Sequence, residues 1–262
     1  MKHNPNDISE PCTYGDLRDK VVLVTGGAGG IGLAISSAFA ANDSQVVIVG
    51  RDKTKLDSVA GNLGENLSAY AFDLGDLRKL PELVETIEKE VGEIDILVNN
   101  AGINLKKDAL EVSDNEFESI VRTNQTAVFA LSREVAKSMV RRGTGSIIMI
   151  SSMASQYGIP KVVAYTASKS AIEGMTRELA VEWSPRGVRV NCIAPGFIAT
   201  DMSAKALDND KERKQKVLSR TPMGKLGDPA DVANAALFLG SGQSKFITGV
   251  VLPVDGGNSI GF

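Results

Sequence analysis

Short β-rich apolar runs alternate with longer stretches of helical periodicity along this chain of 262 residues. The apolar runs are Val21–Thr25, Val46–Gly50, Ser68–Phe72, Ile94–Val98, Ser146–Ser151, Val188–Ile193 and Val250–Val254. The helical stretches between them include Leu77–Val91, Asn124–Arg141, Val162–Trp183 and Pro229–Leu239. Such alternation forms βαβ units, whose right-handed crossovers build a parallel sheet. The sequence therefore predicts a doubly wound α/β protein, with a seven-stranded parallel sheet and helices on both faces.

We find no internal linker, repeat or low-complexity segment in the sequence, so we expect a single domain over residues 20–262. Residues 1–19 are polar and predict a loosely ordered leader. The stretch Phe197–Gly227 is rich in charge and breaks the strand–helix rhythm, which predicts a mobile insertion. The leader lacks the apolar stretch of a signal peptide, and no run approaches the roughly 20 apolar residues of a membrane helix. We therefore expect a cytoplasmic protein that does not bind membranes.

The scarcity of histidine and cysteine argues against several chemistries. His3 is the only histidine and lies in the leader, which argues against Ser-His-Asp and Cys-His hydrolases and histidine-rich zinc sites. Cys12 lies in the leader and Cys192 in a predicted strand, so we expect free thiols and no metal site. A net charge of −3 predicts no nucleic-acid partner.

A cluster of glycines follows the first predicted strand. Thr25 is followed by Gly26-Gly27-Ala28-Gly29-Gly30-Ile31-Gly32, after which a helix begins. Glycines let a backbone turn tightly and approach a ligand closely, and a helix N-terminus offers free N–H groups to phosphate. At the first strand–helix turn of a βαβ series, this pattern predicts a Rossmann-type dinucleotide site; the alternative is an ordinary tight turn.

Tyr165 and Lys169 are four residues apart in a predicted helix, so they share one face. A phenol ordinarily titrates near pH 10, which is too high for acid–base work at neutral pH. A nearby ammonium favours the phenolate and lowers its pKa. Such a pair can donate a proton to a carbonyl oxygen or remove one from an alcohol.

Taken together, the motifs resemble the short-chain dehydrogenase/reductase family over nearly the whole chain, from about Leu17 to Gly257. The matching positions are Thr25 to Gly32, Asn99-Asn100-Ala101-Gly102, Asn124, Ser152, Tyr165 with Lys169, Asn191 with Pro195 and Gly196, and Thr200. The resemblance implies an oxidoreductase that transfers hydride between a nicotinamide cofactor and a secondary alcohol or ketone.

The catalytic residues implied by the resemblance are Asn124, Ser152, Tyr165 and Lys169. Tyr165 would be the general acid/base, and Lys169 would lower its pKa and bind the nicotinamide ribose. Ser152 would donate a hydrogen bond to the substrate oxygen, and Asn124 would hold a water that links Lys169 to solvent. Outside this family, Ser152 would be interpreted as a serine that caps a turn and Asn124 as a helix N-cap.

The cofactor-binding residues follow from the same resemblance. They are Gly26, Gly27, Ala28, Gly30, Ile31, Gly32, Arg51, Asp73, Leu74, Asn100, Ala101, Gly102, Tyr165, Lys169, Pro195, Gly196, Ile198 and Thr200. NAD enzymes place a carboxylate at the end of the second strand, whereas NADP enzymes supply a cation for the 2′-phosphate. Here the strand ends in Gly50 and then Arg51, which favours NADP(H), although the glycine loop lacks the basic residue of many NADP-dependent members. Asp52 leaves the NAD alternative open.

Two substrate classes fit resemblances within the family. Similarity to gluconate 5-dehydrogenase-type enzymes favours a sugar acid such as gluconate or 5-ketogluconate, whose carboxylate would meet Lys106 and Lys107. The alternative is a 3-oxoacyl-(acyl-carrier-protein) reductase, in which Arg133, Arg141 and Arg142 would meet an acidic carrier protein. A catalytically inactive nucleotide-sensing module is the alternative of another class. The resemblance also implies a homotetramer, with the predicted helices Asn124–Arg141 and Val162–Trp183 at one interface.

Overall fold

The computed structural model describes residues 14–64, 66–200 and 211–261. Seven strands in this part of the chain form one sheet in the order β3-β2-β1-β4-β5-β6-β7, and every neighbouring pair is parallel. Their bounds are β1 Val21–Thr25, β2 Gln45–Gly50, β3 Leu67–Ala71, β4 Ile96–Asn99, β5 Gly145–Ile150, β6 Val188–Pro195 and β7 Val251–Val254. The predicted fold class is confirmed.

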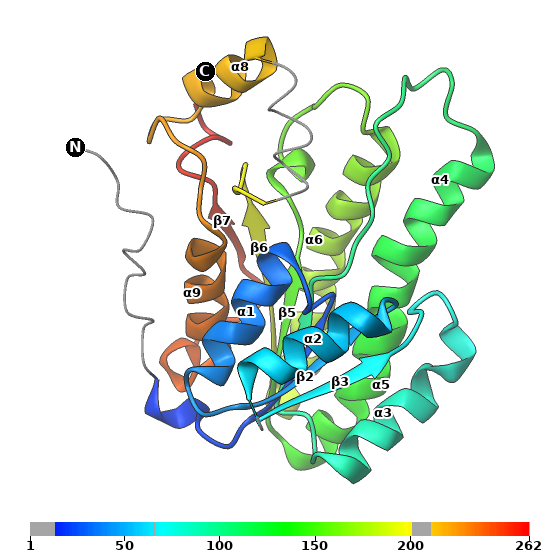
Figure 1. Cartoon of the computed structure of the whole chain (residues 1–262), viewed down its shortest axis with the longest axis vertical. Coiled ribbons are helices and arrows are strands. Elements are labelled where there is room, and N and C mark those ends of the chain that lie inside the picture. Colours follow the sequence, from blue (N-terminus) through cyan, green and yellow to red (C-terminus); the bar gives the residue numbers. More distant parts are fainter. Residues whose placement is uncertain (1–13, 65, 201–210, 262) are drawn as a thin grey trace.

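Helices cover both faces of the sheet (Figure 1). One face packs against α1 (Gly30–Ala40), α2 (Lys53–Leu63) and α9 (Pro229–Gly240), and the other against α3 (Leu80–Glu90), α5 (Ala127–Arg142) and α6 (Val163–Trp183). In β1, Val22 and Val24 belong to the first core, whereas Val21 and Leu23 belong to the second. A strand that is buried on both faces has a continuous run of apolar residues, and the sequence of β1 shows such a run.

The helix that carries Asn124 begins ten residues earlier than its apolar periodicity suggested, at Asp114. Helix α4 (Asp114–Val121) is capped by Ser113, whose side chain accepts from the backbone of Glu116 while the Glu116 carboxylate accepts from the backbone of Ser113. A π-helical segment, Arg122–Thr126, then leads directly into α5. The predicted helix start at Asn124 is therefore wrong, because α4 has a polar first turn and only its capping sequence marks it.

The predicted insertion, Phe197–Gly227, contains helix α8 (Lys211–Arg220). Residues 201–210 of it lie outside the described part of the chain. A parallel bridge between Ile198 and Gly227 closes the base of the segment. Six residues of the predicted leader, 14–19, are described: Gly15–Leu17 form a 3-10 turn, and Leu17 is buried in the core. His3 and Cys12 lie outside the described residues, and Cys192 is a buried free thiol in β6.

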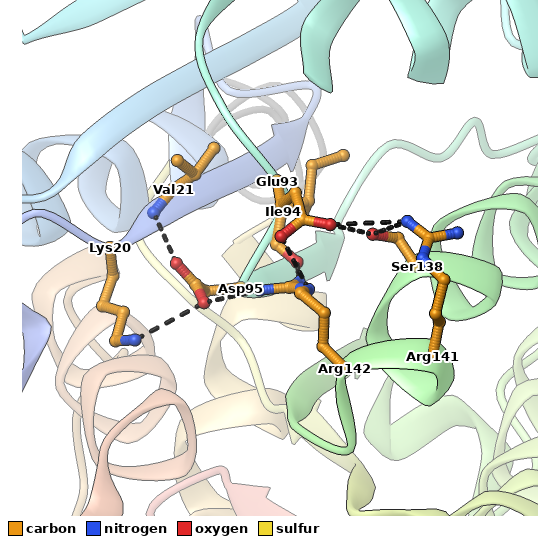
Figure 2. Close-up of polar contacts among 8 residues, drawn as sticks. All are labelled: Lys20, Val21, Glu93, Ile94, Asp95, Ser138, Arg141 and Arg142. Atoms are coloured by element: carbon orange, nitrogen blue, oxygen red, sulfur yellow. Dashed lines mark hydrogen bonds and ion pairs between the residues drawn. The ribbon is translucent and has the colours of Figure 1, made fainter. Parts of the chain in front are cut away.

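The amino-terminal edge of the sheet is held by a charged cluster (Figure 2). Asp95 stands just before β4, donates from its backbone N–H to the carbonyl of Val21 at 2.9 Å and accepts from the Val21 N–H through its carboxylate at 3.1 Å. The same carboxylate pairs with Lys20 at 3.4 Å and Arg142 at 3.2 Å. These contacts join the start of β1 to the end of α5.

The order of strands reverses between β1 and β4, because β2 and β3 extend the sheet on one side of β1 and β4 to β7 extend it on the other. The loops that follow β1 and β4 therefore depart in opposite directions and leave a crevice at the carboxyl ends of the strands. Such a switch point is where doubly wound folds bind ligands. No helix among the described residues is long and apolar enough to cross a membrane.

Candidate active site

A cavity of about 460 Å³ lies at these carboxyl ends and is lined by the segments that follow β1, β4, β5 and β6. It gathers side chains and backbone from residues far apart in the sequence. The predicted residues that line it are Gly26, Gly30, Ile31, Asn100, Ala101, Gly102, Ser152, Tyr165, Lys169, Pro195, Gly196, Ile198 and Thr200. The fold thus brings the glycine loop, the asparagine motif and the tyrosine–lysine pair to one place.

The glycine loop forms a cradle with two layers. Gly26, at φ +66°, turns the chain out of β1, and Gly30 at the start of α1 lines the cavity. Gly32 lies behind them, where a Cβ atom would stand 2.2 Å from the carbonyl oxygen of Gly26. Gly29 is the N-cap of α1 and provides no side-chain cap, so the first N–H groups of the helix are free for an anion. This cradle fits the pyrophosphate of a dinucleotide.

The asparagine motif after β4 is fastened to the end of β1. The hydroxyl of Thr25 accepts hydrogen bonds from the backbone N–H groups of Asn100 and Ala101, both at 3.0 Å. The Asn100 amide donates to the carbonyl of Thr25 at 3.0 Å. Asn99 is buried and donates to Ser132 of α5 at 2.9 Å. These bonds hold the cavity floor between β1 and β4 in one arrangement.

Tyr165, in the first turn of α6, faces Ser152, which follows β5. Burial raises the pKa of the Tyr165 phenol, and a hydrogen bond with Ser152 acts in the opposite direction by favouring the phenolate. This differs from the expectation that Lys169 would set the pKa of Tyr165. Both groups are buried together, and desolvation outweighs the other influences on the phenol.

The Ser152 hydroxyl also accepts a hydrogen bond from the backbone N–H of Ala154 at 3.1 Å, so this serine caps a 3-10 turn. The two interpretations of Ser152, as a turn cap and as a catalytic serine, are therefore compatible. The cap orients the hydroxyl, and the orientation directs it toward Tyr165.

Lys169 is buried one helical turn beyond Tyr165. Its ammonium donates to the carbonyl oxygen of Ile150 at 2.7 Å and lies 5.8 Å from the centre of the Tyr165 ring. Burial lowers the pKa of Lys169 to about 8. A lysine with this pKa is mostly charged at neutral pH and can also exchange its proton.

Asn124 is fully buried inside the π-helical segment, which excludes a helix N-cap. Its side chain accepts from the N–H of Ile103 and donates to the carbonyl of Ile103, both at 2.8 Å, and donates to Ser168 at 3.1 Å. Asn124 and Lys169 both flank Gly102, where a Cβ atom would stand 3.4 Å from the Asn124 oxygen and 3.5 Å from the lysine nitrogen. Asn124 thus fixes the loop after β4 against α6.

A polar group behind the serine turn was missed by the sequence reasoning. Glu173, one turn beyond Lys169 on α6, accepts hydrogen bonds from the hydroxyls of Ser151, at 3.1 Å, and Ser155. Ser155 also contacts the carbonyl oxygen of Ser152. Burial raises the pKa of the neighbouring Cys192 thiol to about 11. A glutamate on a helix gives no signal in the sequence that it supports a loop after another element.

Several predicted cofactor residues lie outside the cavity lining, namely Gly27, Ala28, Gly32, Arg51, Asp73 and Leu74. Arg51 is exposed after β2, Asp73 accepts from the backbone of Gly75 in a turn, and Leu74 packs against the core. Asp52 is the N-cap of α2 and accepts from the N–H of Lys55 at 3.1 Å. The Asp52 carboxylate therefore stabilises a helix end.

The basic residues considered for substrate binding occupy other places. Lys107 forms an ion pair with Glu116 at 2.9 Å, and neither Lys106 nor Lys107 lines the cavity. Arg141 and Arg142 pair with Glu93 and Asp95 at the amino-terminal edge of the sheet (Figure 2), whereas the cavity lies at the carboxyl ends of the strands. Arg133 and Arg141 are exposed on α5, and a contact of Arg133, Arg141 and Arg142 with a carrier protein stays a prediction.

The wall beside Tyr165 is mostly apolar. Its members come from the segments that follow β4, β5 and β6 and include Ile103, Asn104, Met153, Ala154, Ile159, Val162 and Phe197. Lys55 of α2 also lines the cavity, next to Gly29 of the glycine loop, and no pattern in the sequence indicates this position of the lysine. The arrangement joins a phosphate cradle to a buried proton donor, which suits proton transfer to or from a substrate oxygen beside a bound dinucleotide.

Comparison with known proteins agrees with this geometry. The family model described as enoyl-(acyl carrier protein) reductase matches residues 26–259. A 3-oxoacyl-(acyl-carrier-protein) reductase of Vibrio harveyi is 37% identical over 242 residues, which cover 92% of this chain and 98% of that protein. A gluconate 5-dehydrogenase of Gluconobacter oxydans is 37% identical over 241 residues, which cover 91% of this chain and 94% of that protein.

A solved structure is similar over nearly its whole length. It is a candidate NAD(P)-dependent gluconate 5-dehydrogenase from Beutenbergia cavernae with bound NADP at low occupancy. The two structures superpose with a TM-score of 0.86 and are 38% identical in sequence. The match covers 93% of this chain and 98% of the other chain. These relatives share one type of fold and act on different substrates.

Proposed function

Because this chain belongs to the short-chain dehydrogenase/reductase family, we propose that it interconverts a secondary alcohol and its ketone with NADP(H). The observation that carries the proposal is the convergence of Ser152, Tyr165 and Lys169 with the glycine cradle on one cavity. The nicotinamide, when bound, supplies or accepts the hydride.

In reduction, the Tyr165 hydroxyl donates its proton to the ketone oxygen, and in oxidation the phenolate takes the proton of the alcohol. The raised pKa of Tyr165 favours the protonated form that reduction requires. Ser152 donates to the same substrate oxygen, where negative charge grows in the transition state. The Lys169 ammonium holds the end of β5, binds the nicotinamide ribose and stabilises the phenolate when it forms.

Asn124 contributes by holding Ile103, and with it the loop that faces Lys169. Its side-chain oxygen and nitrogen are both engaged with Ile103 and Ser168. A water that links Lys169 to solvent stays a prediction.

We assign NADP(H) as the preferred cofactor from the end of β2. Arg51 is the first residue after the strand, and Asp52 is committed to capping α2. A cation at this position suits a 2′-phosphate, and the carboxylate beside it already accepts a helix N–H through one of its oxygens. The similarity to a structure that contains NADP supports the same choice.

For the substrate we propose a sugar acid of the gluconate type, supported by the similarity to a gluconate 5-dehydrogenase at 37% identity and to a candidate gluconate 5-dehydrogenase at 38% identity. A 3-oxoacyl thioester is the second candidate. It is favoured by the apolar wall beside Tyr165, where Ile159, Val162 and Met153 could contact an acyl chain.

The decisive experiment follows absorbance at the reduced-nicotinamide band with both cofactors. Gluconate and 5-ketogluconate are compared with an acetoacetyl thioester. We expect wild type to turn over the sugar acid with NADP(H). The Tyr165→Phe variant serves as the inactive control. Turnover of the thioester alone would select the second candidate, and inactivity with all ketones and alcohols would overturn the proposal.

A homotetramer and a cytoplasmic location remain proposals from the family resemblance. Light scattering that shows a monomer at micromolar concentration would contradict the tetramer.

A further inference from the structure

The side chain of Lys55 crosses from α2 to the glycine loop. A Cβ atom at Gly29 would stand 2.7 Å from the Lys55 ammonium nitrogen and 3.4 Å from its Cε atom. Both residues line the cavity. The ammonium therefore occupies the space that a side chain at position 29 would otherwise take, and the absence of that side chain lets it lie there.

The backbone of Lys55 is held in place while its side chain remains free to meet a ligand. Asp52 caps the helix through the Lys55 N–H, at 3.1 Å. The ammonium has no hydrogen bond or ion pair with any residue that the structure describes. The neighbouring acid Asp57 is paired with Lys53 at 2.9 Å. An ammonium at a cavity wall that is not paired with a protein carboxylate is suited to bind an anionic ligand.

The position of Lys55 distinguishes between the phosphates of a dinucleotide. The pyrophosphate is expected at the N-terminus of α1, where Gly30 and Ile31 offer free N–H groups. Lys55 instead reaches the loop from α2, which follows the end of β2, and this strand end is where a doubly wound fold reads the adenosine ribose. Arg51 stands four residues earlier in the chain, directly after β2.

We propose that Lys55 binds the 2′-phosphate of NADP(H) and is a determinant of cofactor choice, taking the place of a cation within the glycine loop itself. This inference rests on the proposed NADP(H)-dependent function and adds a residue to it. Lys55 and Gly29 act as a pair, because a side chain at position 29 would displace the Lys55 ammonium from its present place against the loop.

The test measures binding of NADPH and NADH separately, by nucleotide fluorescence titration and by thermal shift, for wild type and Lys55→Ala. A hydrogen bond with a charged partner, discounted for exposure to solvent, predicts NADPH binding weaker by about 10-fold. NADH binding should change by less than about 2-fold, because NADH lacks the 2′-phosphate. Lys53→Ala, on the same helical turn and exposed, is the matched control and should leave both affinities unchanged.

A second variant tests the pairing. Gly29 has an extended backbone, at φ −163° and ψ 156°, which any residue adopts. Among the described residues, the only atoms outside its chain neighbours that lie within 4 Å of a Cβ built at position 29 belong to Lys55. The double variant Lys55→Ala with Gly29→Arg should therefore fold and restore the NADPH preference by supplying the cation from the loop.

Equal losses of NADPH and NADH binding in Lys55→Ala would assign the lysine to the pyrophosphate and overturn the proposal. Unchanged NADPH binding would overturn it as well. Both outcomes differ from failure of the proposed function, in which wild type itself binds NADPH no better than NADH.

Discussion

The ammonium of Lys169 donates a 2.7 Å hydrogen bond to the carbonyl oxygen of Ile150, the last residue of β5. The bond ties the helix that carries Tyr165 to the strand that leads to Ser152. It also keeps a lysine charge inside the protein, where burial lowers its pKa from 10.5 to about 8.

That buried charge predicts how stability depends on pH. Because the folded protein binds this proton less tightly than the unfolded chain, the charged lysine opposes folding below pH 8, and this penalty disappears as the pH rises from about 8 to 10.5. In Lys169→Met the penalty is absent at every pH. The difference in free energy of unfolding, variant minus wild type, should fall by about 3 kcal/mol across this range.

Urea unfolding of wild type and Lys169→Met at several pH values between 7 and 10.5 measures this difference. Lys245→Met, at an exposed lysine, is the control and should follow wild type throughout. A difference between Lys169→Met and wild type that is constant with pH would contradict the predicted effect of burial. The variant should also lose activity.

Removal of the Tyr165 hydroxyl should abolish proton transfer and preserve binding. Tyr165→Phe keeps the ring, and we expect kcat to fall by about 10² to 10⁴, the usual contribution of a general acid–base group. Cofactor affinity, measured by fluorescence titration, should stay within about twofold because the phenyl ring is retained. Tyr70→Phe, on β3, should keep normal activity. Near-normal turnover in Tyr165→Phe would remove Tyr165 from the mechanism.

Gly32 is expected to be irreplaceable for steric reasons. A methyl group there would stand 2.2 Å from the carbonyl oxygen of Gly26 and 2.5 Å from the Asn100 amide, so the glycine loop must shift. Gly32→Ala should lower the free energy of unfolding by about 1–3 kcal/mol and weaken binding of both cofactors. Gly61→Ala in α2, where nothing lies within 4 Å, should instead stabilise by about 0.5–1 kcal/mol. Calorimetry of the two variants compares them; equal stability would refute the steric argument.

The charged cluster at the amino-terminal edge should contribute to stability and leave catalysis unaffected. Asp95→Ala removes the partner of Arg142, whose side chain is 19% exposed, and of the Val21 N–H. We expect a loss of about 1–3 kcal/mol, because both groups lose an acceptor in a half-buried place. Asp57→Ala, which breaks an exposed pair with Lys53, should cost no more than about 0.5 kcal/mol. Urea unfolding measures both; an Asp95→Ala protein as stable as Asp57→Ala would contradict this role.

Sequence patterns that extend over a few residues were enough to predict the fold and part of the candidate site. The apolar run of β1 and the turns between strands and helices depend on local periodicity, so the sheet and its two helical layers could be predicted. The spacing of Tyr165 and Lys169 places both on one helical face, and the glycine cluster marks a close approach of the backbone. These are consequences of neighbours in sequence, and the structure reproduces them.

Other features depend on contacts between residues far apart in the chain. Asn124 lies in the middle of a helical run, where its side chain bonds with Ile103 and Ser168, and no local pattern contains these partners. Lys55 reaches Gly29 only because α2 packs beside the first loop. Burial sets the pKa values of Tyr165 and Lys169, and burial is a property of the packed molecule. Sequence periodicity specifies elements and their buried faces, whereas distances across the cavity and the solvation of its charges are defined only when those elements pack.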